Sequence, residues 1–219
     1  MKKSLLSGLF LCACVVRPCF AADQDQARAA TVTELRPKVE FHPAGAKKKA
    51  LRTGSTIYPG DRMVTLATGE IAFVTADGSL VRLGANTEVT LDDAAKGHNV
   101  FDLAKGLLRA LVSKQGDGSF TVRTANGSAA VKGTQWQIEA APDHSEVKVL
   151  SGTVEVKDPA ADQSVLLHAG EGTITYKDRV AAVRKLDKAE IDALRQAFAS
   201  KVFQARQGYA DRVKKLQGN

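Results

Sequence analysis

From about residue 31 to residue 183, apolar and polar residues alternate with a period of two, in short runs separated by turn residues. Because a half-buried strand points successive side chains to opposite faces, this pattern predicts strands of about four to six residues. Their regular spacing predicts an all-β fold, either a short-stranded sandwich or jelly roll or a solenoid-like stack. The runs include MVTLA (63–67), IAFVTA (71–76), LVRL (80–83), FTVRT (120–124), QWQIE (135–139) and TVEV (153–156).

The stretch VKGTQWQI, residues 131–138, interrupts this alternation. Inward positions are odd-numbered up to Val131 and even-numbered from Trp136 onward, so the buried face changes between them. An extra residue at a glycine is what a β-bulge requires, and Gly133 lies at this point. We therefore predict a bulge at Gly133, with Thr134 and Trp136 facing the core. A phosphate loop is excluded, because the order is Lys-Gly-Thr and a strand follows.

The period changes after residue 183, where a capping box spans Asp187 to Glu190. Apolar residues then recur every three or four positions, which predicts an amphipathic helix of roughly 30 residues and about 45 Å within residues 184–219. The helix either docks on the β domain or pairs with a partner helix, including one from a second copy. The candidate partner-binding residues on it are Phe198, Val202, Tyr209 and Val213.

Residues 1–22 have the features of a signal peptide: basic Lys2 and Lys3, an apolar run at 5–16, and small residues before a cut near Ala21. The run is shorter than the roughly 20 residues of a membrane span. An uncleaved anchor is one alternative, and a lipoprotein modified at Cys14 is another. We expect an exported protein, periplasmic or extracellular. All three cysteines precede the expected cut, so the mature chain would have no disulfide or thiolate site.

Removal of this segment reduces the 31 basic residues to 28 against 24 acidic ones, and the net charge from +7 to +4. A cationic cluster remains at Lys47, Lys48, Lys49 and Arg52. Outside the cytoplasm it would meet anionic polysaccharide or lipid head groups, and these four residues are the candidate anion-binding site. The alternative is a solvated loop. No aromatic residues interleave with these bases, so we expect no nucleic-acid partner.

The sequence contains no clear catalytic or metal-binding set. The histidines at 42, 98, 144 and 168 are isolated, without metal-ligand spacing. Asp61 follows a Pro-Gly turn, where a carboxylate commonly accepts bonds from backbone N–H groups. We therefore expect no enzyme activity, no metal and no cofactor.

Ordered motifs lie at Ile57–Thr65, Asp77–Leu83, Phe120–Thr124, Val131–Trp136, Gly152–Val154 and Ala169–Glu171. Their structural residues are Gly60, Asp61, Gly78, Gly133, Thr134, Trp136, Gly152 and Gly170. Together, these motifs within residues 32–176 resemble the FecR domain, an extracytoplasmic β domain of iron-transport regulators. The resemblance implies a FecR-like β domain at residues 23–183, but only two charged residues precede the apolar run, which leaves no room for a cytoplasmic sigma-binding part. The expected function is therefore a non-catalytic exported envelope protein acting in protein–protein interaction or sensing. The alternatives are a binder of anionic polymer or lipid, and a membrane-anchored signal relay.

Overall fold

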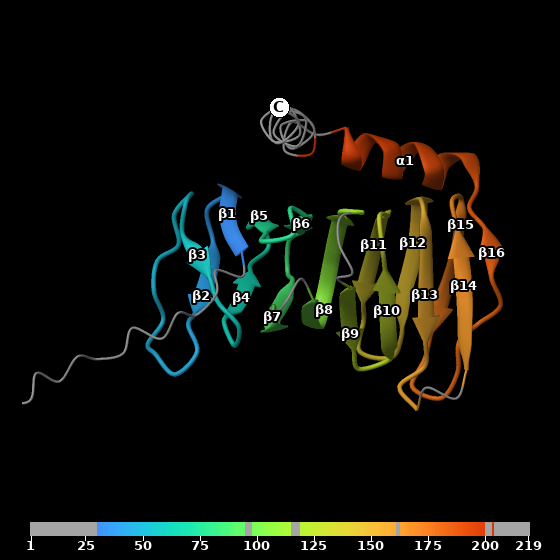
Figure 1. The fold of residues 1–219 in the computed structure, drawn as a ribbon, viewed down its shortest axis with the longest axis horizontal. Coiled ribbons are helices and arrows are strands. Elements are labelled where there is room, and N and C mark those ends of the chain that lie inside the picture. The colour runs from blue at the N-terminus through green and yellow to red at the C-terminus, as the bar shows by residue number, and fades with distance from the viewer. Residues whose placement is uncertain (1–29, 95–97, 115–118, 161–162, 200–202, 204–219) are drawn as a thin grey trace, which may run out of the picture.

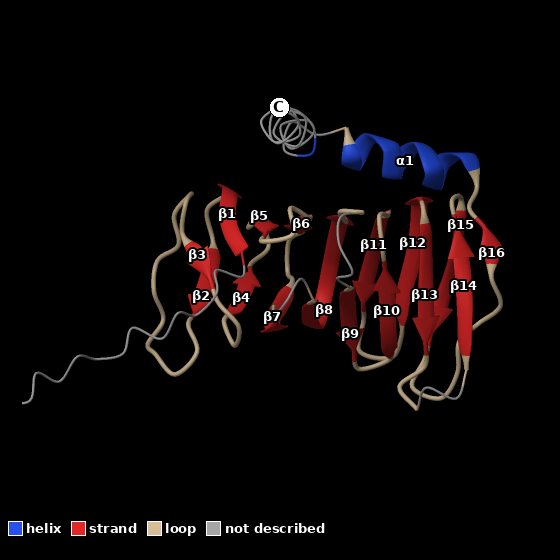
Figure 2. Cartoon of the chain, viewed as in Figure 1, coloured by secondary structure: helices blue, strands red, loops and turns tan. Residues whose placement is uncertain are grey.

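The computed structural model describes residues 30–94, 98–114, 119–160, 163–199 and 203. They form two β-sheets, A and B, that face each other, and one helix lies on the outer face of sheet A (Figures 1 and 2). The predicted all-β fold is confirmed, with its strands in two facing sheets. The predicted signal peptide lies outside the described residues.

Sheet A contains nine strands, and all neighbours in it are antiparallel. In spatial order they are β3 (Thr56–Ile57), β1 (Ala30–Leu35), β5 (Ile71–Thr75), β6 (Leu80–Leu83), β8 (Asn99–Leu111), β11 (Gln135–Ala140), β12 (Ser145–Ser151), β15 (Glu171–Thr175) and β16 (Arg184–Lys185).

Sheet B contains eight strands and shares β8 with sheet A. Its pairs are antiparallel except for β8 and β9, which are parallel. In spatial order they are β2 (Val39–His42), β4 (Arg62–Thr65), β7 (Glu88–Asp93), β8, β9 (Phe120–Thr124), β10 (Gly127–Val131), β13 (Thr153–Lys157) and β14 (Ser164–His168).

Strand β8 passes from one sheet to the other at Gly106. Its residues 99–105 pair in sheet B with β7 and β9, and its residues 106–111 pair in sheet A with β6 and β11. Gly106 has a φ of 89°, and a Cβ there would lie 2.5 Å from the Cα of Thr87. The corner therefore requires a residue without a side chain.

The inward side chains of both sheets form one apolar core. A chain of ring contacts crosses it from Phe73 to Phe101, Phe120 and Trp136, with centroid distances of 5.9, 5.1 and 6.4 Å. Trp136 is fully buried, as predicted. The only tryptophan thus fills the space between the sheets.

The predicted bulge at Gly133 is wrong. Strand β10 ends at Val131 in sheet B and β11 begins at Gln135 in sheet A, so residues 132–134 are the crossing between the sheets. Gly133 has a φ of 67° in this crossing. The buried face changes because the chain changes sheets, and a sequence pattern alone does not distinguish this from an inserted residue. Thr134 is buried as predicted and its hydroxyl donates to the carbonyl of Thr153 at 3.0 Å.

Helix α1 (Lys188–Phe198) begins with the predicted capping box and ends with Ala199 as its C-cap. It is shorter than the continuous helix predicted within residues 184–219. Strand β16 also extends the sheet two residues beyond the predicted domain boundary at 183. Figure 1 shows α1 lying along one side of the row of strands. Beyond Ala199 only Phe203, which is again helical, is described.

Candidate functional site

The outer face of sheet A, where α1 covers it, is the most organised surface among the described residues. At one end the contact is apolar, and Leu80 of β6 is 1% exposed beneath it. Phe198 and Phe203 pack together with a centroid distance of 4.7 Å. The α1 cluster, as we name this group, comprises Ala72, Leu80, Leu186, Leu194, Phe198 and Phe203, with the half-buried Val74, Leu111, Leu150 and Ile191 packed against it.

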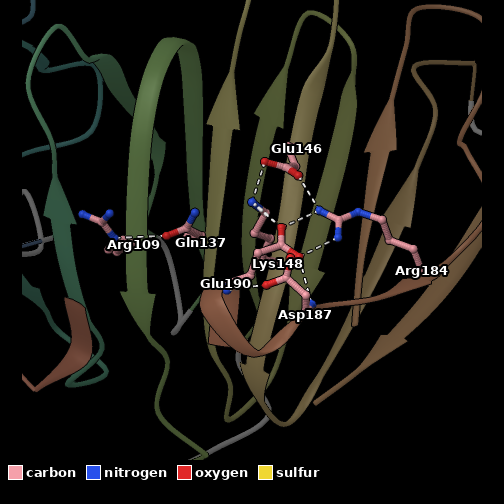
Figure 3. Close-up of polar contacts among 7 residues, drawn as sticks. All are labelled: Arg109, Gln137, Glu146, Lys148, Arg184, Asp187 and Glu190. Carbon is pink, nitrogen blue, oxygen red and sulfur yellow. Dashed lines mark hydrogen bonds and ion pairs between the residues drawn. The ribbon is translucent and has the colours of Figure 1, made fainter. Parts of the chain in front are cut away.

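At the other end the contact is ionic (Figure 3). Arg184 of β16 donates to both carboxylate oxygens of Glu190, at 2.8 and 2.7 Å, and to Glu146 of β12 at 2.8 Å. The Lys148 amine lies 2.9 Å from Glu146 and 3.0 Å from Glu190. These four residues, the ionic network, join two strands of sheet A to the first turn of α1.

Glu190 also belongs to the capping box. Its backbone N–H donates to the Asp187 carboxylate at 2.8 Å, and its own carboxylate accepts from the Asp187 N–H at 3.1 Å. One side chain therefore both starts the helix and fastens it to the sheet.

The ionic network stabilises the charged forms of Glu190, Arg184 and Lys148. Hydrogen bonding to Arg184 holds the pKa of Glu190 far below its usual range, and bonding to Glu190 raises the pKa of Arg184. Burial alone would lower the pKa of Lys148, but its hydrogen bonds to Glu146 and Glu190 outweigh burial and raise it. Lys148, Arg184 and Glu190 are thus charged at neutral pH.

A groove with a volume of about 320 Å³ lies between sheet A and α1. Arg109 of β8 lines it, and its Nε donates to the Gln137 side chain at 3.1 Å. Figure 3 shows the terminal nitrogens of Arg109 pointing away from Gln137. Burial and the nearby Arg82 lower the pKa of Arg109, against smaller opposing effects of Glu139 and Glu70. Neither of these acids lies within ion-pair distance of Arg109 in the described part of the chain. The groove is lined by Arg109, Gln137, Lys148, Ala189, Glu190, Ala193 and Leu194.

The predicted partner-binding residues fall in different places. Phe198 lies in the α1 cluster and is 8% exposed, so it faces the chain's own sheet. Val202, Tyr209 and Val213 lie outside the described residues. Docking, one of the two predicted arrangements, is therefore observed for α1.

The predicted anion-binding residues, Lys47, Lys48, Lys49 and Arg52, are all exposed on one loop. Lys48 pairs with Glu40. The backbone of Lys49 forms an isolated bridge with Phe41 at the start of this loop. All four residues lie on the loop between β2 and β3, which is at the opposite end of the row of strands from β12 and β16 (Figure 1).

The remaining motif residues shape turns. The buried Asp61 carboxylate accepts from the backbone N–H groups of Ala44 and Tyr58, each at 2.9 Å, as the sequence predicted. Gly60, Gly78, Gly152 and Gly170 all have positive φ. These residues are structural.

Sequence reasoning missed the ionic network and the Arg109 groove. Their members occupy outward positions on strands, where charged residues are ordinarily solvated, and only the fold shows that a helix covers them. The part of the chain that is described brings together no group of three or more potential metal-binding side chains. Within the same residues, no helix combines the length and hydropathy needed to cross a membrane.

The chain resembles known proteins both in sequence and in fold. Residues 61–155 match the sequence model of the family described as FecR protein, which confirms the resemblance over that range. Two crystal structures of a "putative anti-sigma factor" from Parabacteroides distasonis ATCC 8503, at 1.65 and 2.50 Å resolution, are similar in fold. Each is 20% identical with a TM-score of 0.53, covering 62% of this chain and 64% of that chain, which is less than two thirds of its length. No curated protein matches the sequence.

Proposed function

We propose that this chain, which carries a FecR match at residues 61–155, is a non-catalytic exported module that acts in signal regulation by binding a protein partner. The observation that carries the proposal is the contact between α1 and sheet A. It is part apolar and part ionic, like the transient interfaces between domains and between proteins. A mixed interface of this kind is typical of reversible binding, in which one bound segment can replace another. A helix with a purely structural role would be expected to bury a continuous apolar stripe.

Several features support a binding role over a catalytic one. Glu146, Lys148 and Arg184 on sheet A pair with one another or with Glu190 and hold α1 in place. The buried Asp61 carboxylate holds a turn. The matched family and the similar folds contribute the regulatory context, which is carried to this chain as part of the proposal.

The test is capture of a protein from envelope extract by residues 23–219, with chemical cross-linking, followed by reconstitution of the purified pair. We expect one protein that binds saturably with a fixed stoichiometry. Failure of any captured protein to bind in reconstitution would contradict the proposal. A chain ending at residue 183 is the matched comparison, because it lacks β16 and α1 and so loses both Arg184 and Glu190.

A second candidate function is binding of an anionic envelope polymer or lipid. It is favoured by Lys47, Lys49 and Arg52, which are exposed and form no ion pair within the described residues. The test is binding of anionic vesicles or lipopolysaccharide by wild type and by a Lys47/Lys48/Lys49→Ala variant. Binding that survives about 0.5 M salt, where charges are screened within a few ångströms, would exclude this mode.

Export itself is part of the proposal and has a direct measurement. The mass and N-terminal sequence of the protein made in its natural cell type should show a start near Ala22. An intact N-terminus would favour the membrane-anchored relay instead, and a lipid-modified Cys14 would show a lipoprotein.

A further inference from the structure

We propose that the outer face of sheet A is a docking site for an acidic amphipathic helix of a partner protein, and that α1 is an intramolecular occupant which this helix displaces. The inference rests on the proposed function, because it specifies where the protein partner binds and what it must look like.

The charges beneath α1 favour an acidic partner. Glu190 is the only acid that α1 contributes to the ionic network. When α1 leaves, the uncovered surface holds three bases, Arg109, Lys148 and Arg184. Two acids remain beside them: Glu146, which pairs with Lys148 and Arg184, and Glu139, which lies opposite Glu146 on β11 and interacts electrostatically with Arg109. The bases remain in excess by one. This surface therefore attracts a helix that brings carboxylates, and it disfavours a basic one.

The apolar residues of sheet A beneath α1 favour a helical partner. Departure of α1 would expose Leu80, Leu111 and Leu150, which project from three different strands of sheet A. A flat apolar patch of this kind favours an amphipathic helix, whose anchors recur every three or four residues. Leu194 and Phe198, four residues apart on α1, show the spacing that fits.

Helix α1 also fills the site incompletely. Beside Leu194, the groove of about 320 Å³ is bordered on the helix by Ala189 and Ala193, whose side chains are single methyl groups. On the sheet side, the hydrogen bond of Arg109 is to the neutral Gln137, and the acids Glu139 and Glu70 act on it only through space. A helix with an acidic side chain at the position of Ala193 would place a carboxylate in the same groove as Arg109, and a partner can therefore bind the face better than α1 does.

The chain's own helix reduces the apparent affinity for any partner. Because α1 is joined to β16 by Leu186 and Asp187, its local concentration at the site is high. A partner helix must wait for α1 to open, so binding should strengthen when α1 is weakened.

The experiment uses the chain's own helix as a probe in trans. Fluorescent peptides of residues 186–203 are prepared with Ala193→Glu and, as the matched control, with Ala193→Lys. They are titrated into the wild-type chain and into a Leu194→Ala/Phe198→Ala chain, whose own helix is released. A Glu190→Lys chain is a second releasing variant, and circular dichroism checks that the sheets of both remain folded.

We expect the acidic peptide to bind the released chains about tenfold more tightly than the basic peptide, and about tenfold more tightly than it binds wild type. The advantage of the acidic peptide should disappear in an Arg109→Ala background. No saturable binding to either released chain, or equal binding of the two peptides, would overturn the inference.

Two further outcomes separate this inference from the proposed function. If the released chains form dimers in sedimentation and exclude the peptide, the occupant is a second copy, and the partner-helix inference is wrong. If a reconstituted protein partner binds equally well to wild type and to an Arg109→Ala/Leu80→Glu chain, the docking site is refuted while the proposed function stands.

Discussion

The contribution of the ionic network to helix docking can be measured by the substitution Glu190→Gln. Glutamine keeps the size of the side chain and an oxygen that can accept from the Asp187 N–H, so the helix can still begin at Lys188. The substitution removes the charge that Arg184 contacts at 2.7 and 2.8 Å and Lys148 at 3.0 Å. It thereby isolates the fastening of α1 to sheet A from the capping of α1.

The expected magnitude is modest. The side chain of Arg184 is 40% exposed and that of Glu190 21% exposed, so solvent screens the pair. Exposed ion pairs contribute about 0.2–1 kcal/mol each to stability. The bidentate contact between Arg184 and the Glu190 carboxylate lies at the upper end of that range. With the weaker Lys148 contact included, docking should lose about 1 kcal/mol, which raises the opening constant of α1 about fivefold.

Native-state hydrogen exchange at neutral pH reports this opening directly. Amides of α1 should exchange about fivefold faster in Glu190→Gln, while amides of β8 and β11 are unchanged. The matched control is Asp192→Asn, which removes an exposed pair with Arg195 on the same helix and should change little. The difference between Glu190→Gln and wild type should shrink in high salt. Unchanged α1 exchange in Glu190→Gln at low salt would show that the network does not hold the helix.

Three further predictions concern the same structure. Phe198→Ala should release α1 at a cost of about 3 kcal/mol without unfolding the sheets, seen as loss of α1 exchange protection with unchanged strand signals; equal loss in exposed Arg195→Ala would contradict this. Gly152→Ala should cost about 2–3 kcal/mol more than Gly54→Ala in urea unfolding, because both have a φ of 86° but only at Gly152 would a Cβ lie 2.6 Å from the Thr134 hydroxyl; equal losses would refute the steric argument. Acid should release α1 before the sheets unfold: the pKa of Glu190 is lowered on docking, so its contribution is complete above the usual value of 4.5 and is lost as pH falls below it. A helix that stays protected down to the pH of global unfolding would contradict this.

The strand pattern was readable because each strand buries one face. Runs such as 71–76 and 120–124 coincide with β5 and β9, and Asp77 and Gly78 lie in the turn that joins β5 to β6. The pairing of the strands was not readable. Runs 101–104 and 107–112 look like two strands, yet they are the two halves of β8, bent at Gly106. Local sequence specifies which face is buried, and the sheet in which that face lies depends on distant strands.

In the helix too, some features are specified by local sequence and others are not. Asp187 and Glu190 predicted where it starts, since a capping box is a local interaction. Its end was misjudged, because the apolar spacing continues past Phe198 although the helix is capped at Ala199. Phe203, which a single continuous stripe leaves out, is 2% exposed and packs on Phe198. The candidate site could not be predicted from local sequence, because Arg184 reaches Glu146 and Lys148 of β12 only through two strand pairings, of β12 with β15 and of β15 with β16.

The central position of strand β8 determines which parts of the molecule can open independently. Every strand before it in the chain lies on one side of it in both sheets, and every strand after it lies on the other side. The sheets therefore cannot slide past each other without bending a continuous backbone at Gly106, and neither half can peel away without stripping β8 of two neighbours. Repeat arrays can fray one unit at a time from an end, because each unit contacts only the next. Here a single central strand ties four neighbours together, so the sandwich should open as one cooperative unit, with α1 as the part that can detach alone.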